Sequence, residues 1–244
     1  MSTNQSGKNK NGDMTDCFLC ASVRGLGPAV VKNKARVLEK IGIENEQFIQ
    51  SPKVSVYSCK LPFYKNTYWY AIEDNRGIPA CQSYFLIGPE EVYFLEGRSD
   101  PIHNINEYEL ILNRSNLLQY LRFFAGSICS DGSRFFIIEK AEDMEWKETP
   151  SAEYLKELNK QIFAPRIVEM AEECETPLWV VEAIVLYHTE LFKASFELWE
   201  PGPVEMIDDA LIVKELPIIS DQDRLQHIGK FDENGNFTAW NFEE

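Results

Sequence analysis

The sequence contains no run of apolar residues long enough to cross a membrane, and no apolar stretch near its first residue. A bilayer-spanning helix needs about 20 predominantly apolar residues, so a membrane helix is excluded. A secretory signal needs an apolar segment of roughly 7–15 residues, whereas residues 1–16 are polar. We expect those residues to form a disordered tail, and the protein to be soluble and cytoplasmic.

The cysteines lack the regular spacing of a disulfide framework. There are six of them, at positions 17, 20, 59, 81, 129 and 174. We expect these thiols to be reduced, as is usual inside cells. Cys17 and Cys20 have the C-x-x-C spacing of zinc and redox sites, but no second pair completes a zinc site. Two small buried hydrophobic residues explain the spacing equally well.

Histidine is scarce, and complete catalytic motifs are missing. The three histidines are His103, His188 and His227, and no G-x-S-x-G elbow is present. The run from His188 to Glu190 has the H-x-E pattern of zinc deaminases, but the P-C-x-x-C that completes such a site is absent. We therefore predict no metal and no cofactor, and we assign no catalytic residue. A Cys–His pair brought together by folding is left open.

Aromatic and β-branched residues are abundant and predict an α+β fold. The 244 residues include 15 Phe, 10 Tyr and 5 Trp, enough to build a core. Short aromatic-rich runs between turn residues are typical of antiparallel meanders. The predicted strands lie within 54–97, 134–140, 178–199, 204–207, 210–216 and on both sides of Asn234-Gly235. The predicted helices cover 28–41, 106–124 and 149–170, and Pro165 is expected to kink or split the third.

Strands occur in blocks with interspersed helices, an arrangement in which the antiparallel sheets can form two sheet-containing lobes. Beyond the tail, residues 17–145 would form an N-terminal α+β lobe with the aromatic-rich meander. Residues 146–244 would form an acidic C-terminal α+β lobe. One continuous domain fits the same pattern.

Charge is unevenly distributed along the chain. The net charge is −15, which disfavours nucleic acids and anionic membranes as general partners. Residues 139–215 carry nineteen acids and seven bases, whereas residues 1–40 carry seven bases and three acids. Such asymmetry indicates either a docking surface or a solvated surface.

The basic segment 24–40 is the one region that fits nucleic acid. It contains Gly25-Leu26-Gly27-Pro28 before the predicted helix and Gly42-Ile43 after it. Over about twenty residues this pattern resembles one hairpin of a helix-hairpin-helix DNA-binding module. The resemblance implies a weak nucleic-acid contact, while a simple turn and helix cap explains the same residues.

Two groups of residues are candidates for binding a partner protein. Tyr68, Trp69 and Tyr70 lie in the aromatic meander, where alternation along a strand would expose some of the rings. Glu205, Asp208 and Asp209 form an acidic cluster in the C-terminal half, in which residues 207–210 are expected to form a turn. Our leading hypothesis is a non-enzymatic interaction protein (an accessory subunit, inhibitor or immunity-type protein) that docks a basic partner through this half.

The acidic cluster also permits an enzymatic alternative. Carboxylates near Lys214 are the groups with which a metal-dependent hydrolase or nuclease would hold Mg²⁺ and stabilise a phosphate. The D/E-x-K spacing of many such nucleases is absent, since Ile212 stands two residues before Lys214. Converging carboxylates in a pocket would favour the enzyme, whereas carboxylates spread over an open surface would favour the interaction protein.

Overall fold

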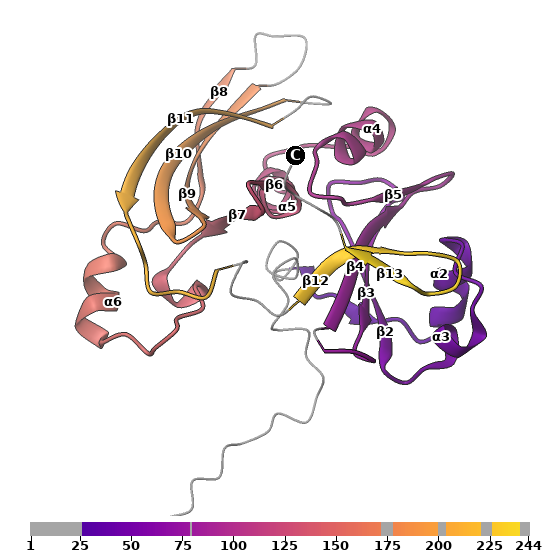
Figure 1. The fold of residues 1–244 in the computed structure, drawn as a ribbon. Helices are drawn as coiled ribbons and strands as arrows, with labels where there is room; N and C mark the ends of the chain where they lie inside the picture. The colour runs from indigo at the N-terminus through magenta and orange to yellow at the C-terminus, as the bar shows by residue number, and fades with distance from the viewer. Residues whose placement is uncertain (1–25, 79, 172–177, 200–203, 221–225, 240–244) are drawn as a thin grey trace, which may run out of the picture.

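The computed structural model describes residues 26–78, 80–171, 178–199, 204–220 and 226–239 (Figure 1). Two sheets, both largely antiparallel, and several short helices form an α+β fold, as the sequence predicted. Among the described helices, none combines the length and the apolar character that crossing a bilayer requires.

The first sheet has seven strands in the order β1-β2-β3-β4-β12-β13, with β5 paired to β4. Its strands are β1 (Ala29–Val30), β2 (Val54–Lys60), β3 (Tyr68–Asp74), β4 (Ala80–Ile87), β5 (Val92–Phe94), β12 (Gln226–Phe231) and β13 (Phe237–Ala239). The predicted meander is confirmed by β2 to β5. The hairpin around Asn234-Gly235 is also confirmed, although its loop spans 232–236, because the Asp232 carboxylate accepts hydrogen bonds from the backbone of Asn234 and Asn236.

The second sheet has six strands in the order β11-β10-β9-β7-β6, with β8 paired to β9. Its strands are β6 (Cys129–Ser130), β7 (Ser133–Ile138), β8 (Arg166–Ala171), β9 (Leu178–Tyr187), β10 (Glu190–Trp199) and β11 (Val204–Val213). The predicted pairing of 178–188 with 191–199 is confirmed by β9 and β10, which are joined at His188-Thr189. The division at residue 145 that the sequence suggested does not coincide with the division between the sheets, because β7 precedes it and β12 pairs with β4.

The helices within the described residues are α2 (Lys34–Lys40), α3 (Glu46–Gln50), α4 (Asp100–Glu109), α5 (Leu117–Ser127), α6 (Ala152–Leu158) and a 3₁₀ turn at Ala141–Asp143. Helix α5 lies between the two sheets (Figure 1). Its buried residues share one hydrophobic cluster with Trp69 and Tyr84 of the first sheet and Trp179 and Val181 of the second. A common core therefore joins the two sheets.

All three predicted helices have wrong boundaries. The first begins at Lys34 rather than residue 28, because Ala29 and Val30 pair with β2. It ends at Lys40, and Gly42 follows as the expected stop: the N–H groups of Gly42 and Ile43 donate to the carbonyls of Glu39 and Leu38, which is a Schellman motif.

The second predicted helix is two helices, α4 and α5. Residues 110–116 separate them, and at the end of this segment the side-chain amide of Asn116 donates to the carbonyls of Pro62 and Ile111. The third ends at Leu158, seven residues before the proline that was expected to interrupt it, and the residues after Pro165 form β8, which pairs with β9.

Residues 204–216 were expected to form two short strands around a turn at 207–210, and this expectation is wrong. They contain one ten-residue strand, β11. Asp208 and Asp209 lie opposite Ser195 and Ala194 of β10, so hydrogen bonding to β10 continues through the predicted turn. This change determines how the acidic cluster is presented.

Candidate functional site

Strand β11 is the outermost strand of the second sheet, and most of its residues are exposed. Within the described residues it pairs with β10 alone, so its other edge is open. Every side chain from Glu205 to Leu211 is exposed, including three large apolar ones. Met206, Ile207 and Leu211 expose 46%, 46% and 42% of their surface. Both faces and one edge of β11 are thus accessible to another molecule.

The three acids of the cluster are divided between the two faces of β11. Residues directly opposite on paired strands point to the same face. Asp209 lies opposite Ala194, which in turn lies opposite Ala183 in the core, so Asp209 is on the inner face, the one directed toward α5. Asp208 lies opposite Ser195 and is therefore on the outer face, as is Glu205 opposite Glu197. The carboxylates are exposed and do not converge on one point.

A bulge in β11 separates the acids. Ser195 pairs with Asp208, but the next residue, Phe196, pairs with Met206, which leaves Ile207 as an extra residue in the strand. Bulges and charged side chains on an edge strand hinder uncontrolled pairing between molecules. The open edge is therefore protected from self-association without being covered.

Two cations on the outer face, Lys193 and Arg166, are already paired with a carboxylate. Glu182 of β9 accepts hydrogen bonds from Lys193 at 2.9 Å and from Arg166 at 2.6 Å. The bonds from Lys193 and Arg166 lower the pKa of Glu182, so this carboxylate stays charged. Glu182, Ser195 and Asp208 form one cross-strand row. Within the described chain, no ion pair neutralises Glu205, Asp208 or Asp209.

The aromatic candidates lie in the other sheet. Tyr68 is 41% exposed, and Tyr70 is half-buried and stacks on Phe85. Trp69 is fully buried and stacks on Tyr84, so it is not on any surface of this fold. Both faces of β3 are covered, which leaves Tyr68 as the exposed ring of the three. The structure does not bring these residues together with the acidic cluster.

The basic segment is partly used for internal contacts. The ammonium group of Lys34 donates to the carbonyls of Ser51 and Val54 at 2.5 and 2.6 Å, and burial lowers its pKa. Lys40 reaches the carbonyl of Gly88 at 3.5 Å. Arg24, Gly25 and the C-x-x-C pair lie outside the described residues.

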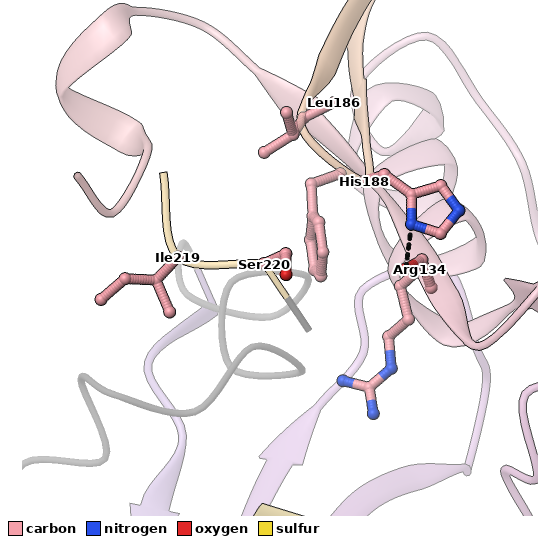
Figure 2. Close-up of a pocket in the computed structure, with 7 residues that line it drawn as sticks. Arg134, Leu186, His188, Ile219 and Ser220 are labelled. Carbon is pink, nitrogen blue, oxygen red and sulfur yellow. Dashed lines mark hydrogen bonds between the residues drawn. The ribbon is translucent and has the colours of Figure 1, made fainter. Parts of the chain in front are cut away.

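A small hollow, partly open to solvent and with a volume of about 10 Å³, lies beside the β9–β10 turn (Figure 2). Its lining includes Ser133, whose hydroxyl is 2.8 Å from Nδ1 of His188, and Arg134, whose guanidinium points away from that histidine. Sequence analysis missed this Ser–His pair because 55 residues separate its members.

A serine beside a histidine is the minimal arrangement of a nucleophile and its base. A nucleophile must reach its substrate, whereas Ser133 is 1% exposed. His188 and Asp131 both have positive φ, in the turns that follow β9 and precede β7. The bond from Ser133 to His188 therefore links two strained turns, which is a structural role. Among the described residues, no three His, Cys, Asp or Glu side chains are grouped so as to hold a metal ion.

Comparison with protein-family models, with curated proteins and with solved structures finds no match to this chain.

Proposed function

We propose that the chain is a non-enzymatic interaction protein, an accessory subunit, inhibitor or immunity-type protein, that binds a basic partner protein through its acidic second sheet. One observation carries the proposal: β11 presents three uncompensated carboxylates and three exposed apolar side chains on an open sheet edge. Charge of one sign speeds the encounter with an oppositely charged surface, and apolar area supplies much of the affinity.

The apolar anchor of this interface is on β11 itself. Met206 and Leu211 lie on the inner face, opposite Phe196 and Phe192, and Ile207 projects from the bulge. The aromatic meander contributes at most Tyr68, which is on a different sheet. Acidic and apolar contacts within one strand give a compact binding site.

The other candidate functions receive less support from the geometry. Carboxylates on opposite faces cannot surround one metal ion, which disfavours a hydrolase at Glu205–Asp209. Lys34 is occupied by backbone carbonyls, which weakens the case for nucleic acid at the basic segment. Free thiols at Cys59 and Cys81 are consistent with the reducing cytoplasm, where we place the protein.

The proposal is tested by affinity capture from the cells that make the protein. Wild-type bait is compared with the triple variant Glu205→Gln, Asp208→Asn, Asp209→Asn. A matched bait carries Glu90→Gln, Glu107→Gln and Glu148→Gln, three exposed acids outside β10 and β11, so that both variants lose the same charge. Quantitative mass spectrometry then measures what each bait recovers.

We expect a basic protein that wild type and the matched bait recover equally and that the β11 variant recovers poorly. Its association rate with wild type should fall steeply between low and high salt, because salt screens exposed charges. Equal recovery by all three baits, or an association rate that salt does not change, would refute the proposal.

A further inference from the structure

We infer that the partner binds by strand addition: an extended segment that contains basic and apolar residues pairs with the open edge of β11 and extends the second sheet. This inference rests on the proposed function and specifies the chemistry of the partner. Strand addition takes its affinity from main-chain hydrogen bonds and its specificity from the side chains on the two faces.

The backbone of β11 has the groups that strand addition needs. In an antiparallel ladder, successive residues direct their N–H and C=O groups alternately toward one neighbour and toward the other side. From Asp208 to Leu211 the pairing with β10 is regular, one residue opposite one residue. Of any two adjacent residues in this stretch, one therefore bonds to β10 and the other directs its N–H and C=O outward. These outward groups form a row that an added strand would match.

The side chains of β11 define which segment fits. On the inner face lie Met206, Asp209 and Leu211, and on the outer face lie Glu205, Asp208 and Ala210. A strand running antiparallel to β11 would place apolar residues opposite Leu211 and Met206. It would place basic residues opposite each of the three acids, because opposite charges facing one another across strands are stabilising. If the bulge residue Ile207 stays unpaired, as it does against β10, the predicted segment from the residue opposite Leu211 to the residue opposite Glu205 is apolar, small, basic, basic, apolar, basic.

The negative charge of β11 favours a segment of another protein, rather than a second copy of this chain, as the strand that pairs with its open edge. Two copies of β11 side by side would place three carboxylates of one strand beside three of the other, with no base between Val204 and Val213 to relieve the repulsion. Like charges facing one another across strands are destabilising. A basic segment meets the same edge with attraction instead.

The probe is a fluorescein-labelled peptide with the core Val-Thr-Lys-Lys-Val-Lys flanked by threonines. The control peptide has the same sequence but is N-methylated at consecutive core residues, so it has the same charge and donates from neither edge. Fluorescence anisotropy measures the dissociation constant of each peptide with the full chain at low salt. We expect the control peptide to bind at least tenfold more weakly, since about 1.4 kcal/mol corresponds to a tenfold change.

Two proline variants test the edge without altering charge, and one of them blocks it. Ala210→Pro and Leu211→Pro each remove one backbone N–H, and by alternation one of the two removes an outward N–H while the other removes a bond to β10. Thermal unfolding distinguishes the two variants, because the variant that loses a hydrogen bond to β10 should have the lower melting temperature. Leu211→Ala controls for the lost side chain.

We expect the outward proline variant to keep its fold and to bind the peptide about tenfold more weakly than its control. If the proline variants bind like wild type while the neutralised β11 variant fails, the partner docks by charge without adding a strand; the inference then falls and the proposed function stands. If the peptide does not bind wild type at all, or binds equally with and without N-methylation, the inference is also refuted. Sedimentation showing wild type to be a dimer that the outward proline dissociates would replace the partner strand with a second copy.

Discussion

Replacing Gly235 by alanine tests whether the C-terminal hairpin closes over the first sheet. Gly235 lies in the loop between β12 and β13 with φ at +72°. A Cβ atom added there would lie 2.5 Å from Cδ2 and 2.6 Å from Cγ of Phe48. Phe48 is fully buried and its ring centroid is 5.0 Å from that of Phe231, so it has little room to move.

Two costs add in this variant. A residue other than glycine in the left-handed region costs about 1–2 kcal/mol. Forcing an extra carbon into a packed core costs about 1–3 kcal/mol. The free energy of unfolding should therefore fall by roughly 2–5 kcal/mol. In a chain of this size, that loss corresponds to a melting temperature lower by roughly 4–20 °C.

Gly42→Ala is the matched control. Gly42 also has a positive φ, +83°, but an added Cβ would meet nothing within 4 Å. It should lose only the backbone cost, about 1–2 kcal/mol. Urea denaturation of both variants separates the packing cost from the backbone cost. Equal losses in the two variants would show that the hairpin does not lie against Phe48, and would refute the reasoning.

Three further predictions concern single side chains. Lys34→Met should lower the free energy of unfolding by about 1.5–3 kcal/mol in urea denaturation, because two carbonyls lose a charged donor; Lys32→Met, at an exposed lysine, should change it by less than about 0.5 kcal/mol. Cys59, whose pKa burial raises to about 11, should resist a thiol reagent at pH 8 in the folded protein and react once urea unfolds it; fast labelling of this site in the native state would contradict the structure. The pKa of Asp232 is lowered by hydrogen bonds from Asn236, so its stabilisation is present above the unfolded pKa and is lost as the pH falls below about 4; Asp232→Asn should flatten this acid dependence of the melting temperature, and an unchanged profile would contradict it.

Local patterns in the sequence predicted the strands well. The runs that became β2 to β5, β7, β9 and β10 are separated by turn residues, and these signals act over a few neighbours. Helix boundaries were less predictable. Ile167 and Met170 have spacing that fits a helix, yet they lie in β8 and pair with Val181 and Trp179 of β9, the next strand along the chain, and this pairing decides their conformation.

The sequence predicted the acidic residues of the candidate site but not its apolar residues. Glu205, Asp208 and Asp209 were identified from charge alone, and the structure places them on an exposed strand. The exposure of Met206 and Leu211 was not predictable, because such residues usually enter a core and only the order of strands makes β11 an edge.

The burial of Trp69 likewise depends on the tertiary arrangement of the fold. Alternation would expose it only if one face of β3 were open. The hydrophobic clusters on both faces of the first sheet cover that strand instead. Which faces are covered depends on contacts between distant segments, which the local sequence does not show.

The central claim, that the open edge of β11 accepts an added strand, is tested most directly by amide hydrogen exchange. NMR measures the exchange rate of each amide of β11 with and without the peptide whose core is Val-Thr-Lys-Lys-Val-Lys. In the free protein, exchange from Asp208 to Leu211 should alternate between slow amides bonded to β10 and fast amides directed outward. Adding the peptide should slow the fast amides and leave the slow ones nearly unchanged. Unchanged exchange in β11, or protection confined to another part of the chain, would contradict the account.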